Sequence, residues 1–532
     1  AVVHQWFEGN KKSLLADFVV GTIDQFLLAA LRQKHVMLRH LGLAGKVVIL
    51  DECHAFDAYM NYYLDRALEW MGAYRVPVII LSATLPAQRR TQLIHAYLGK
   101  TPKPAAVGWR QRKQASPPPP PAPWTVSRGY PLLTWTEGET VRQRELPNTG
   151  ASHQVLLERV ARGDLSVRLK ALLINGGYAG VMVNTVDRAQ QIAAEMKAAF
   201  PDDEVTLVHA QFITPDRAEL EKKLLSKLGK PRDGQARSGR YIVVGTQVIE
   251  QSLDLDFDVL VTDLCPMDLL LQRMGRLHRH DRARPEGLKA ARCLIMEATG
   301  EGFEPGAEAI YKAYPLMRTL AFLPEDALNL PDDIPRLVQD VYDDQLPLDP
   351  PPAGYETAKK EWQDLIAKQE GRAGTYRMRG PYALDSMAGW LEMVPSEAAG
   401  EASVRDGGDS VEVLVVYHQA DGQYAPLPWT EEGPASQGVF AHETPSPEAA
   451  RQLAKQSLRL PRRLCHEGMI DKTIAELEAA NKVLSAWQQS PWLKGQLFLV
   501  FDAAYEAMLC GYRLNYQKEL GLQIINEGGA HD

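Results

Sequence analysis

The chain has 532 residues, a formal net charge of −8 at pH 7 and 45% hydrophobic residues. This length predicts three or four domains, and because no run of eighteen apolar residues occurs, no membrane partner is expected. The negative charge argues against a protein that coats nucleic acid non-specifically, yet it leaves room for a local basic groove that grips one strand. Five scattered cysteines without a CxxC pair indicate neither a zinc site nor a disulfide scaffold, so we expect a reducing, cytoplasmic setting.

Residues 1–112 alternate short apolar stretches with helical segments. Strands are expected at residues 18–20, up to Asp51 and at 76–81, and helices at 24–32 and 62–72. Apolar strands separated by helices predict a parallel sheet with helices on both faces. Many prolines follow between residues 102 and 147, and they predict a stiff spacer or exposed loop, because proline suits neither a helix interior nor a central strand.

The alternating pattern resumes near residue 150. Strands are expected at residues 180–184, 205–208, 241–244, 259–262 and 291–296. Beyond residue 300, prolines and acidic residues show no strong period, apart from one isolated helix at 355–369 that we expect to bridge parts of the molecule. After about residue 395, turn residues and a short strand at 411–417 indicate a small mixed α+β domain.

Two adjacent carboxylates follow the first well-defined strand. Asp51 and Glu52 come at its carboxyl end, where open parallel sheets place their chemistry. Two such charges need a cation between them, and Mg²⁺ with a nucleoside triphosphate suits them. We expect Asp51 to hold the metal, directly or through water, and Glu52 to orient the attacking water. Residues 51–54 then indicate a nucleotide hydrolase of the DExH-box type, although the run alone also fits an acidic turn after a buried strand.

Hydroxyl and arginine side chains elsewhere supply further groups. Ser82 and Thr84 follow the strand at 76–81, and their hydroxyls suit bonding to the acidic turn and passing on its state. Arg276 and Arg279 are three residues apart, hence on one face if the segment is helical. Two fixed guanidiniums can stabilise charge on a γ-phosphate. Taken alone, the segment also fits a basic surface helix.

A Gly-Thr pair follows the strand at 241–244. Gly245 and Thr246 can offer a backbone amide and a hydroxyl to a phosphate. Further on, Asp254 can accept a hydrogen bond from a nucleotide ribose or from the arginines. The alternative is an ordinary strand–turn–helix connection. Basic runs at 273–284 and 462–463 are candidates for nucleic-acid patches, though such runs are more often solvated faces.

Six short motifs occur in the order and at the spacing of superfamily 2 helicases: residues 21–25, 51–54, 82–84, 183–185, 245–254 and 272–279. Finer features resemble one branch, the CRISPR-associated helicase–nucleases recruited by the type I Cascade surveillance complex. These features are residues 6–7, 20–25, 54–60, 81–86, 250–256 and 404–407. The resemblance covers nearly the whole chain.

The resemblance implies an α/β fold with two RecA-like parallel-sheet domains, the first incomplete, then a linker helix and a small α+β C-terminal domain. The expected boundaries are 1–112 for the first RecA-like domain, 113–149 for a proline-rich connecting segment, 150–300 for the second RecA-like domain, 301–394 for the linker and 395–532 for the C-terminal accessory domain.

The function implied by the resemblance is ATP-dependent translocation, 3′ to 5′, on single-stranded DNA, together with DNA unwinding. Base sequence would be read by the guide RNA of the surveillance complex. Asp51 would serve Mg²⁺ and Glu52 the hydrolytic water. Arg276 and Arg279 would be finger residues, with Gln272 beside them.

Further roles are carried over to matching positions. Three residues would couple hydrolysis to movement: His54, Ser82 and Thr84. Four polar residues match positions that contact the tracked strand: Thr22, Gln25, Thr185 and Thr246. Gly245 and Asp254 would help to bind the nucleotide.

Two features of the family are not found in the sequence. A phosphate-binding GxxxxGK[ST] loop should precede Asp51, and none is present; the first glycine is missing from the nearest match, Gly99-Lys100-Thr101. The family's N-terminal HD nuclease domain is also absent, and metal-ligand spacing is lacking around His280-Asp281 and His531-Asp532. We therefore expect the C-terminal portion of a family member, with little ATP turnover by itself.

Two other functions stay open from the residues alone. One is another superfamily 2 helicase, acting on DNA or RNA, since phosphate-tracking motifs barely read the sugar. The other is a non-hydrolysing DNA-binding or docking module whose motifs persist as scaffolding. An upstream HD nuclease domain would favour the CRISPR helicase, and strand binding insensitive to ATP would favour the docking module.

Overall fold

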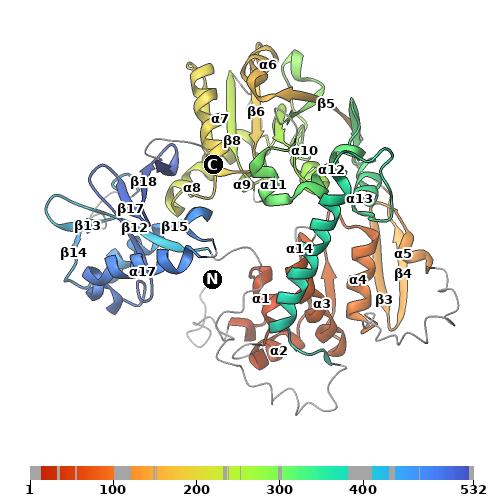
Figure 1. The fold of residues 1–532 in the computed structure, drawn as a ribbon, viewed down its shortest axis with the longest axis horizontal. Helices are drawn as coiled ribbons and strands as arrows, with labels where there is room; N and C mark the ends of the chain where they lie inside the picture. Colours follow the sequence, from red (N-terminus) through yellow and green to blue (C-terminus); the bar gives the residue numbers. More distant parts are fainter. Residues whose placement is uncertain are drawn as a thin grey trace. The chain divides into compact units, whose positions relative to one another are not determined.

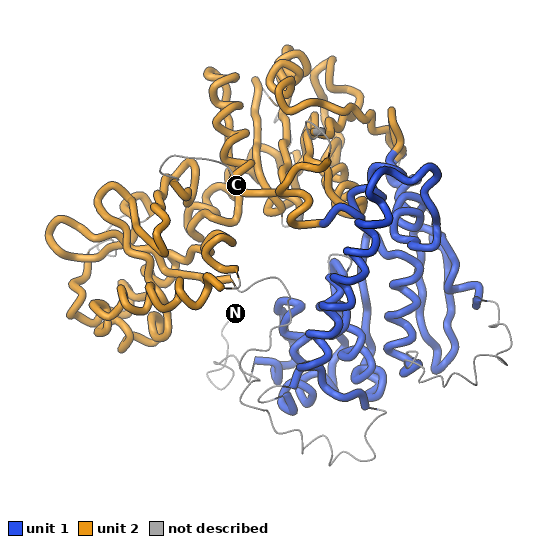
Figure 2. Tube along the Cα trace, viewed as in Figure 1, with its two compact units in different colours: residues 1–152, 312–323, 330–406 blue, residues 153–311, 324–329, 407–532 orange. Residues whose placement is uncertain are grey.

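The computed structural model describes residues 13–32, 36–53, 57–100, 121–147, 150, 152–231, 237, 239–251, 253–297, 302–381, 410–430, 438–466 and 468–525. The chain divides into two compact units (Figure 2). The first unit contains residues 1–152, 312–323 and 330–406, and the second contains residues 153–311, 324–329 and 407–532. Each unit has its own hydrophobic cores.

The first unit contains a short parallel sheet with helices, a hairpin and a long helix (Figure 1). Its elements are α1 (Ile23–Leu27), α2 (Val36–Ala44), β1 (Val48–Leu50), α3 (Ala58–Ala73), β2 (Val78–Ile80), α4 (Ala87–Tyr97), α5 (Pro123–Val126), β3 (Leu132–Glu137), β4 (Thr140–Glu145), α12 (Ala313–Phe322), α13 (Ile334–Tyr342) and α14 (Tyr355–Tyr376). β1 and β2 are parallel neighbours, with Ile49 opposite Ile79.

Helix α3 organises the core of the first unit. Its N-cap residue Asp57 accepts a hydrogen bond from the Met60 amide at 2.7 Å. Buried residues then recur every three or four positions, through Tyr63, Leu64 and Ala67 to Met71, which is the spacing of a helix with one apolar face. The predicted helix at 62–72 is confirmed and begins four residues earlier, at Ala58.

The predicted helix at 355–369 is also present, but it is not isolated. It runs on to Tyr376 and packs against α3, where the Tyr63 hydroxyl donates to the Ala373 carbonyl at 3.2 Å. Beyond its end, the Met378 amide donates to the Ala30 carbonyl at 2.8 Å. The linker segment therefore completes the core of the first unit.

Two sequence-based expectations for this unit are wrong. The predicted strand at 18–20 is irregular chain, and the Phe18 and Val20 side chains are almost fully exposed. The described part of the proline-rich tract is more than a loop, because β3 and β4 form a six-pair antiparallel hairpin in it. Alternating half-buried and exposed residues in β3 carry the strand signal that the nearby prolines obscured.

The second unit contains an α/β part and the C-terminal region. The α/β elements are β5 (His153–Ala161), α6 (Leu165–Leu172), β6 (Gly177–Met182), α7 (Val186–Ala199), β7 (Glu204–Val208), α8 (Thr214–Leu228), β8 (Arg240–Gly245), α9 (Val248–Gln251), β9 (Val259–Asp263), α10 (Met267–Met274), β10 (Ala291–Glu297), α11 (Pro305–Tyr311) and β11 (Ala327–Leu330). Their strands form a seven-stranded sheet in the order β11-β5-β10-β9-β6-β8-β7.

All five strands predicted for this sheet are confirmed as β6 to β10, and they pair in parallel. β8 and β9 are buried along almost their whole length, as expected for central strands covered on both faces. Two strands of the sheet, β5 and β11, were not predicted. β5 mixes charged with apolar residues, and β11 lies in a segment without clear periodicity.

The C-terminal region is a mixed α+β structure, as predicted. Its elements are β12 (Glu412–His418), β13 (Gln423–Ala425), β14 (Val439–Phe440), α16 (Pro447–Lys455), β15 (Ser457–Arg459), α17 (Ile470–Asn481), β16 (Phe498–Phe501), β17 (Glu506–Leu509), β18 (Tyr512–Gln517) and β19 (Gly521–Ile525). β12 lies inside a five-stranded sheet, and β17 to β19 form an antiparallel sheet of three.

Buried polar groups join this region to the α/β part of the same unit. The Asp216 carboxylate on α8 accepts from the Tyr516 hydroxyl at 2.7 Å and from the Trp429 indole nitrogen at 3.1 Å. After β7, His209 Nε2 lies 2.9 Å from the Leu520 carbonyl oxygen. These contacts are satisfied hydrogen bonds between buried groups, so the two parts hold a defined arrangement.

Candidate functional site

The acidic turn predicted after the first strand is present. β1 ends at Leu50, and Asp51 and Glu52 follow it with exposed side chains. Glu52 has a φ of 57°, a left-handed conformation that is strained for a residue with a Cβ. Its amide donates to Asp51 Oδ1 at 3.0 Å. Strain of this kind concentrates at functional sites, and here it fixes two carboxylates at the carboxyl end of β1.

Cys53 follows the two carboxylates and is buried. Burial raises the pKa of its thiol to about 12, so the thiol stays protonated near neutral pH and is unsuited to nucleophilic attack or metal binding. His54 lies outside the described residues, and its coupling role stays a prediction.

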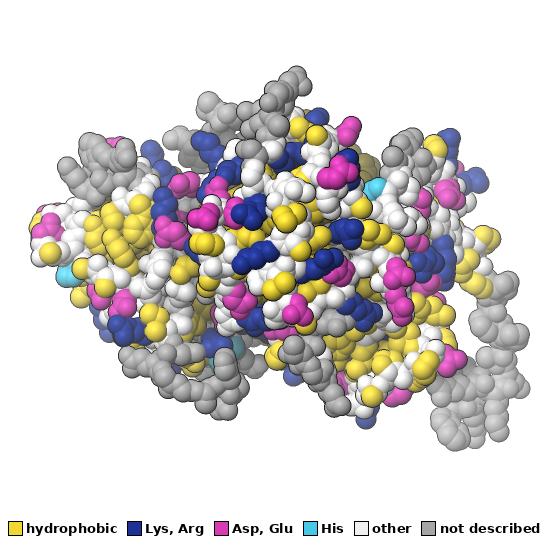
Figure 3. Space-filling view, turned by 90° about the horizontal axis from the view of Figure 1, so that it is seen from above, with side chains coloured by type: hydrophobic (Ala, Val, Ile, Leu, Met, Phe, Trp, Pro, Cys, Tyr) yellow, Lys and Arg dark blue, Asp and Glu magenta, His cyan; other side chains and the backbone are white. Residues whose placement is uncertain are grey.

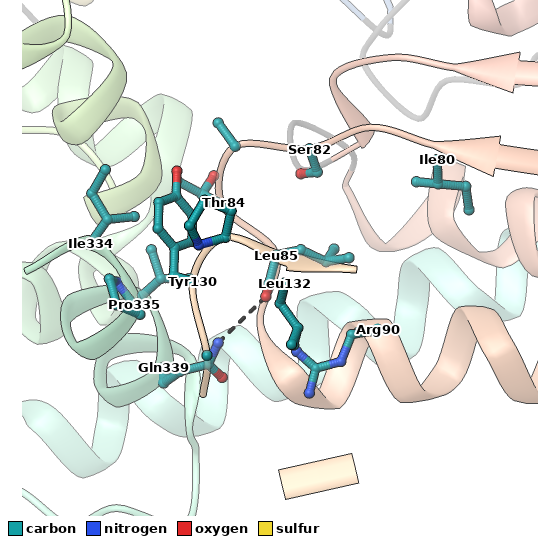
Figure 4. Close-up of a pocket in the computed structure, with 14 residues that line it drawn as sticks. Ile80, Ser82, Thr84, Leu85, Arg90, Tyr130, Leu132, Ile334, Pro335 and Gln339 are labelled. Atoms are coloured by element: carbon teal, nitrogen blue, oxygen red, sulfur yellow. Dashed lines mark hydrogen bonds between the residues drawn. The ribbon is translucent and has the colours of Figure 1, made fainter. Parts of the chain in front are cut away.

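Ser82 and Thr84 follow β2 and line a pocket of about 230 Å³ within the first unit (Figure 4). Thr84 is 3% exposed, and its hydroxyl has no hydrogen-bond partner among the residues the structure describes. Gln339 on α13 reaches the same turn, where its amide oxygen accepts from the Ala87 amide at 2.8 Å. The turn that carries Thr84 is thus held by the linker segment.

Thr22 directly precedes helix α1, and Gln25 lies on it. Thr22 is the exposed N-cap residue of α1. Gln25 is exposed on α1, and its side-chain oxygen accepts from Arg39 Nη1 at 2.9 Å. Arg39 therefore adds a positive charge beside these two candidate strand-contacting residues, a group that the sequence analysis did not single out.

Gly245 is the last residue of β8 and Thr246 follows it, close to the prediction, but the amide of Thr246 is engaged within the fold. It donates to the Val208 carbonyl at 3.2 Å. A Cβ at position 245 would lie 2.8 Å from that same oxygen, which explains the glycine. Thr185 is the N-cap residue of α7, and its hydroxyl accepts from the Arg188 amide at 3.3 Å. Its own hydroxyl hydrogen is a donor suited to a phosphate.

Arg276 and Arg279 do not share a helix face, because α10 ends at Met274. The following chain instead runs beside Phe257, whose amide donates to the Arg276 carbonyl at 2.9 Å. Gln272 lies on α10 itself and is half-buried. The condition under which the two arginines would share a face, a helical segment, is therefore not met, since both follow the end of α10.

Both arginines nevertheless converge on the segment that follows α9. Arg276 is buried and donates to the Glu250 carbonyl at 2.6 Å and to the Leu253 carbonyl. Arg279 is more exposed and donates to Asp254 Oδ1 at 2.5 Å. Partial burial alone would raise the pKa of Asp254, but the hydrogen bond and charge of Arg279 lower it overall. Asp254 therefore accepts from one of the two arginines, Arg279, which agrees with one of its two predicted roles.

Arg273 is a residue whose role the sequence analysis missed. It is fully buried and donates to Glu250 Oε1 at 2.6 Å, to the Thr262 hydroxyl at 2.8 Å and to Asn184 Oδ1 at 3.0 Å. It joins three of the predicted motif segments in one network. No local signal in the sequence marks this role, because Arg273 is one of five arginines between residues 273 and 284.

The basic run at 273–284 is not an exposed basic patch, because four of its five arginine side chains are largely buried and only that of Arg279 is substantially exposed. Two of them pair with one aspartate, Arg282–Asp256 at 2.6 Å and Arg284–Asp256 at 2.9 Å, and Arg237, from outside the run, pairs with Asp258 at 2.7 Å. Asp256 also accepts from the Arg279 amide at 2.9 Å, so this cluster positions the turn that carries Arg279. On the face drawn in Figure 3, basic and acidic side chains are interspersed.

No group of three or more His, Cys, Asp or Glu side chains within the described residues is placed to hold a metal ion. None of the helices they form is both long and apolar enough to cross a membrane.

This α/β architecture defines the class: a RecA-like helicase fold with a C-terminal domain. Two family models match the chain, one described as "CRISPR-associated nuclease/helicase Cas3, C-terminal" at residues 175–282 and one as "Cas3 C-terminal domain" at residues 405–522. The chain belongs to the Cas3 family of CRISPR-associated helicases.

Similar proteins and structures cover almost the whole chain. It is 42% identical to the CRISPR-associated nuclease/helicase Cas3 of Streptococcus thermophilus over 98% of its length, and 31% identical to that of Thermus thermophilus over 99%. It spans 56% and 59% of those two proteins.

The structure of T. fusca Cas3 with AMPPNP shares 27% identity at a TM-score of 0.81, covering 98% of this chain and 58% of that one. A chain of a CRISPR RNA-guided surveillance complex before nicking shares 28% identity at a TM-score of 0.74, covering 98% of this chain and 62% of that one.

Proposed function

We propose that this chain forms the motor part of an ATP-dependent DNA helicase of CRISPR interference. The observation that carries the proposal is the strained turn at Glu52, which presents two exposed carboxylates at the carboxyl end of a parallel strand. The similarity to Cas3 proteins, one solved with AMPPNP and one within a surveillance complex, supports a nucleotide, DNA and that complex as partners.

Mg²⁺ with ATP fits the acidic turn. Magnesium is usually held by one or two carboxylates together with substrate phosphates and waters, so the two carboxylates of Asp51 and Glu52 suffice without a larger cluster. When bound, the ion would neutralise charge on the phosphates. Asp51 would hold it through water, and Glu52 would accept a proton from the attacking water and orient it.

The arginine turn would serve the same reaction. Arg279 is the better candidate finger, because its side chain is 43% exposed, whereas Arg276 is tied to two backbone carbonyls. Arg276 would then position the segment that bears Asp254. Thr22, Gln25, Thr185 and Thr246 would contact phosphates of a single strand tracked 3′ to 5′, and Ser82, Thr84 and His54 would couple hydrolysis to that movement.

ATP hydrolysis tests this proposal. The chain would be joined to the part of the Streptococcus thermophilus relative that it does not match, and phosphate release would be measured with single-stranded DNA, with RNA and without nucleic acid. We expect DNA to stimulate hydrolysis, Glu52→Gln to abolish it, and Arg279→Ala to lower kcat by roughly 10³-fold or more.

The matched control is Arg142→Ala, which breaks an exposed ion pair with Glu137 at 3.3 Å and should leave kcat unchanged. Hydrolysis that survives Glu52→Gln would refute the role of Glu52. Strand binding without any hydrolysis would favour a docking module, and stronger stimulation by RNA would favour an RNA helicase.

A further inference from the structure

Helix α4 begins directly after the turn that carries Ser82 and Thr84, and its first amide finds an acceptor outside the helix. The first amides of any helix have no intrahelical partner, and the N-cap residue Pro86 makes no side-chain hydrogen bond to them. The acceptor for the Ala87 amide is Gln339 Oε1 on α13, at 2.8 Å. A side chain 252 positions further along the chain therefore caps this helix.

The same side-chain amide also donates to the turn. Gln339 Nε2 lies 3.4 Å from the Leu85 carbonyl oxygen, the hydrogen bond drawn as a dashed line in Figure 4. A glutamine side chain carries an acceptor and a donor in one planar group, and here they meet a carbonyl and an amide on either side of Pro86. Two contacts fix both the position and the orientation of the turn, whereas one would fix its position alone.

Helix α13 is itself held by a buried arginine. Arg318 on α12 is 1% exposed. Its guanidinium donates to three carbonyls at the end of α13: Asp340 at 2.6 Å, Val341 at 2.5 Å and Asp343 at 2.8 Å. The last carbonyls of a helix lack intrahelical partners, and the helix dipole favours a cation there. α13 is therefore a firm support for the Gln339 side chain.

The turn is less firmly packed on the side that faces α13. The pocket of about 230 Å³ lies there, lined by Thr84 and by Ile334, Pro335 and Val338 of α13. The buried Thr84 hydroxyl has no hydrogen-bond partner among the described residues, which costs free energy. Since the neighbouring cavity leaves room for the turn to shift, the contacts of Gln339 rather than close packing set its position.

Helix α13 also follows closely on a strand of the seven-stranded sheet. β11 ends at Leu330 and α13 begins at Ile334, so only residues 331–333 join them. β11 is an edge strand of that sheet, and the Asp326 carbonyl just before it accepts from the Leu157 amide of β5 at 2.7 Å. Because the connection is short, a displacement of β11 is passed on to α13.

We propose that Gln339 is a positioning residue for the Ser82–Thr84 turn, and that α13 sets this turn through the Gln339 side-chain amide. Gln339 lies outside all six sequence motifs, and it acts on the turn rather than on a nucleotide or a strand. The consequence for activity rests on the proposed function, in which Ser82 and Thr84 couple hydrolysis to movement. Without the Gln339 amide, hydrolysis continues but moves the strand less far for each ATP.

Hydrogen exchange in the chain by itself tests the contact. In Gln339→Ala the Ala87 amide loses its acceptor, so its exchange should become about three- to tenfold faster, the effect of losing one hydrogen bond. Gln339→Glu keeps that acceptor but loses the donor to Leu85, and should change the exchange less. The matched control is Gln345→Ala, which alters an exposed glutamine of the same linker segment and should leave the exchange unchanged.

Strand displacement per ATP tests the consequence. In the joined protein of the hydrolysis experiment, displacement of a DNA strand and release of phosphate are measured together. Gln339→Ala should lower displacement per ATP by about three- to tenfold, with hydrolysis in the absence of DNA unchanged and the melting temperature lowered by no more than about 4 °C. A merely structural loss would lower both rates together and leave their ratio unchanged.

Unchanged exchange at Ala87 in Gln339→Ala would overturn the proposal, and so would an unchanged ratio of displacement to hydrolysis in an active protein. If the alanine variant does not fold, Gln339→Glu decides the same ratio, which should still fall because the donor to Leu85 is lost. If exchange becomes faster but the wild type neither hydrolyses ATP nor displaces a strand, Gln339 still positions the turn and the proposed function fails instead.

Discussion

The two parallel sheets of this chain differ in how far they are closed. The seven-stranded sheet of the second unit buries its central strands on both faces. The C-terminal region is hydrogen-bonded to the same α/β part through Asp216 and His209. The two-stranded sheet of the first unit leaves one face apolar and exposed. The acidic turn follows a strand of the two-stranded sheet, whereas Arg276 and Arg279 follow helix α10 of the second unit. Half of the proposed chemistry is thus next to a sheet that is buried on both faces and half next to a sheet with one exposed face.

Among substitutions in the second unit, Arg273→Ala should lower the free energy of unfolding most. Replacing Arg273 by Ala leaves the fully buried Glu250 without its cation, and losing one partner of a buried pair costs about 3–5 kcal/mol. Arg279→Ala is the control, because its ion pair with Asp254 is substantially exposed and such pairs contribute about 0–1 kcal/mol. Urea unfolding of each variant measures the difference; equal losses would contradict the network described for Arg273.

Arg273 shows how much of the candidate site could be predicted from the sequence. The strands β6 to β10, the acidic turn and the Gly-Thr turn were predictable, because apolar runs ending in polar residues have a strong signature. The contacts of Arg273 join residues 89 positions apart, and no local pattern reports which arginine of a run turns inward. The same reason explains why the sequence left open whether Arg276 and Arg279 lie on a helix.

The first unit was harder to predict for a different physical reason. The 18–20 segment has strand composition, but a strand forms only when a neighbour pairs with it, and Phe18 and Val20 are exposed instead. The 132–145 hairpin was hidden by flanking prolines. Sequence patterns therefore predicted five of the seven strands in the sheet of the second unit. In the first unit they predicted only the strands and helices around its core.

Matched isoleucines compare the two sheets directly. Ile242 is central in β8 and fully buried, so Ile242→Ala should cost about 2–5 kcal/mol. Ile49 in β1 is 63% exposed, so Ile49→Ala should change stability by no more than about 0.5 kcal/mol. Denaturant midpoints of the two variants measure this contrast. A large loss at Ile49 in the isolated chain would mean that the face is covered.

The contact between the C-terminal region and the α/β part of the second unit should weaken in acid, because His209 then becomes protonated. The Gln211 amide donates to His209 Nδ1 at 3.1 Å, so that nitrogen must be unprotonated, and burial lowers the pKa of His209 to about 4. The unfolded chain then binds the proton first as pH falls from about 6.5 to 4, and stability is lost across that window.

The expected loss is up to roughly 3 kcal/mol, from the size of this pKa shift. Unfolding of the wild type and of His209→Gln would be compared between pH 7 and 4. The difference between them cancels other acid effects, including the raised pKa of the buried Asp216 carboxyl. A constant difference across the window would contradict a neutral His209 in the fold.

Of these substitutions in the second unit, Gly521→Ala should have the smallest effect on stability. Its φ is 68°, and a Cβ there would lie 2.7 Å from the Gln211 carbonyl oxygen and from His209 Cε1. Gly521→Ala should therefore destabilise the second unit by about 1–3 kcal/mol. Gly163→Ala, where a Cβ meets nothing within 4 Å, is the control. Thermal melting of the two variants separates them.

Amide hydrogen exchange tests the contrast between the sheets most directly, because exchange reports local opening. In the chain alone, amides of residues 48–50 and 78–80 should exchange far faster than those of 241–245. Equally slow exchange in both sheets of the isolated chain would contradict the account.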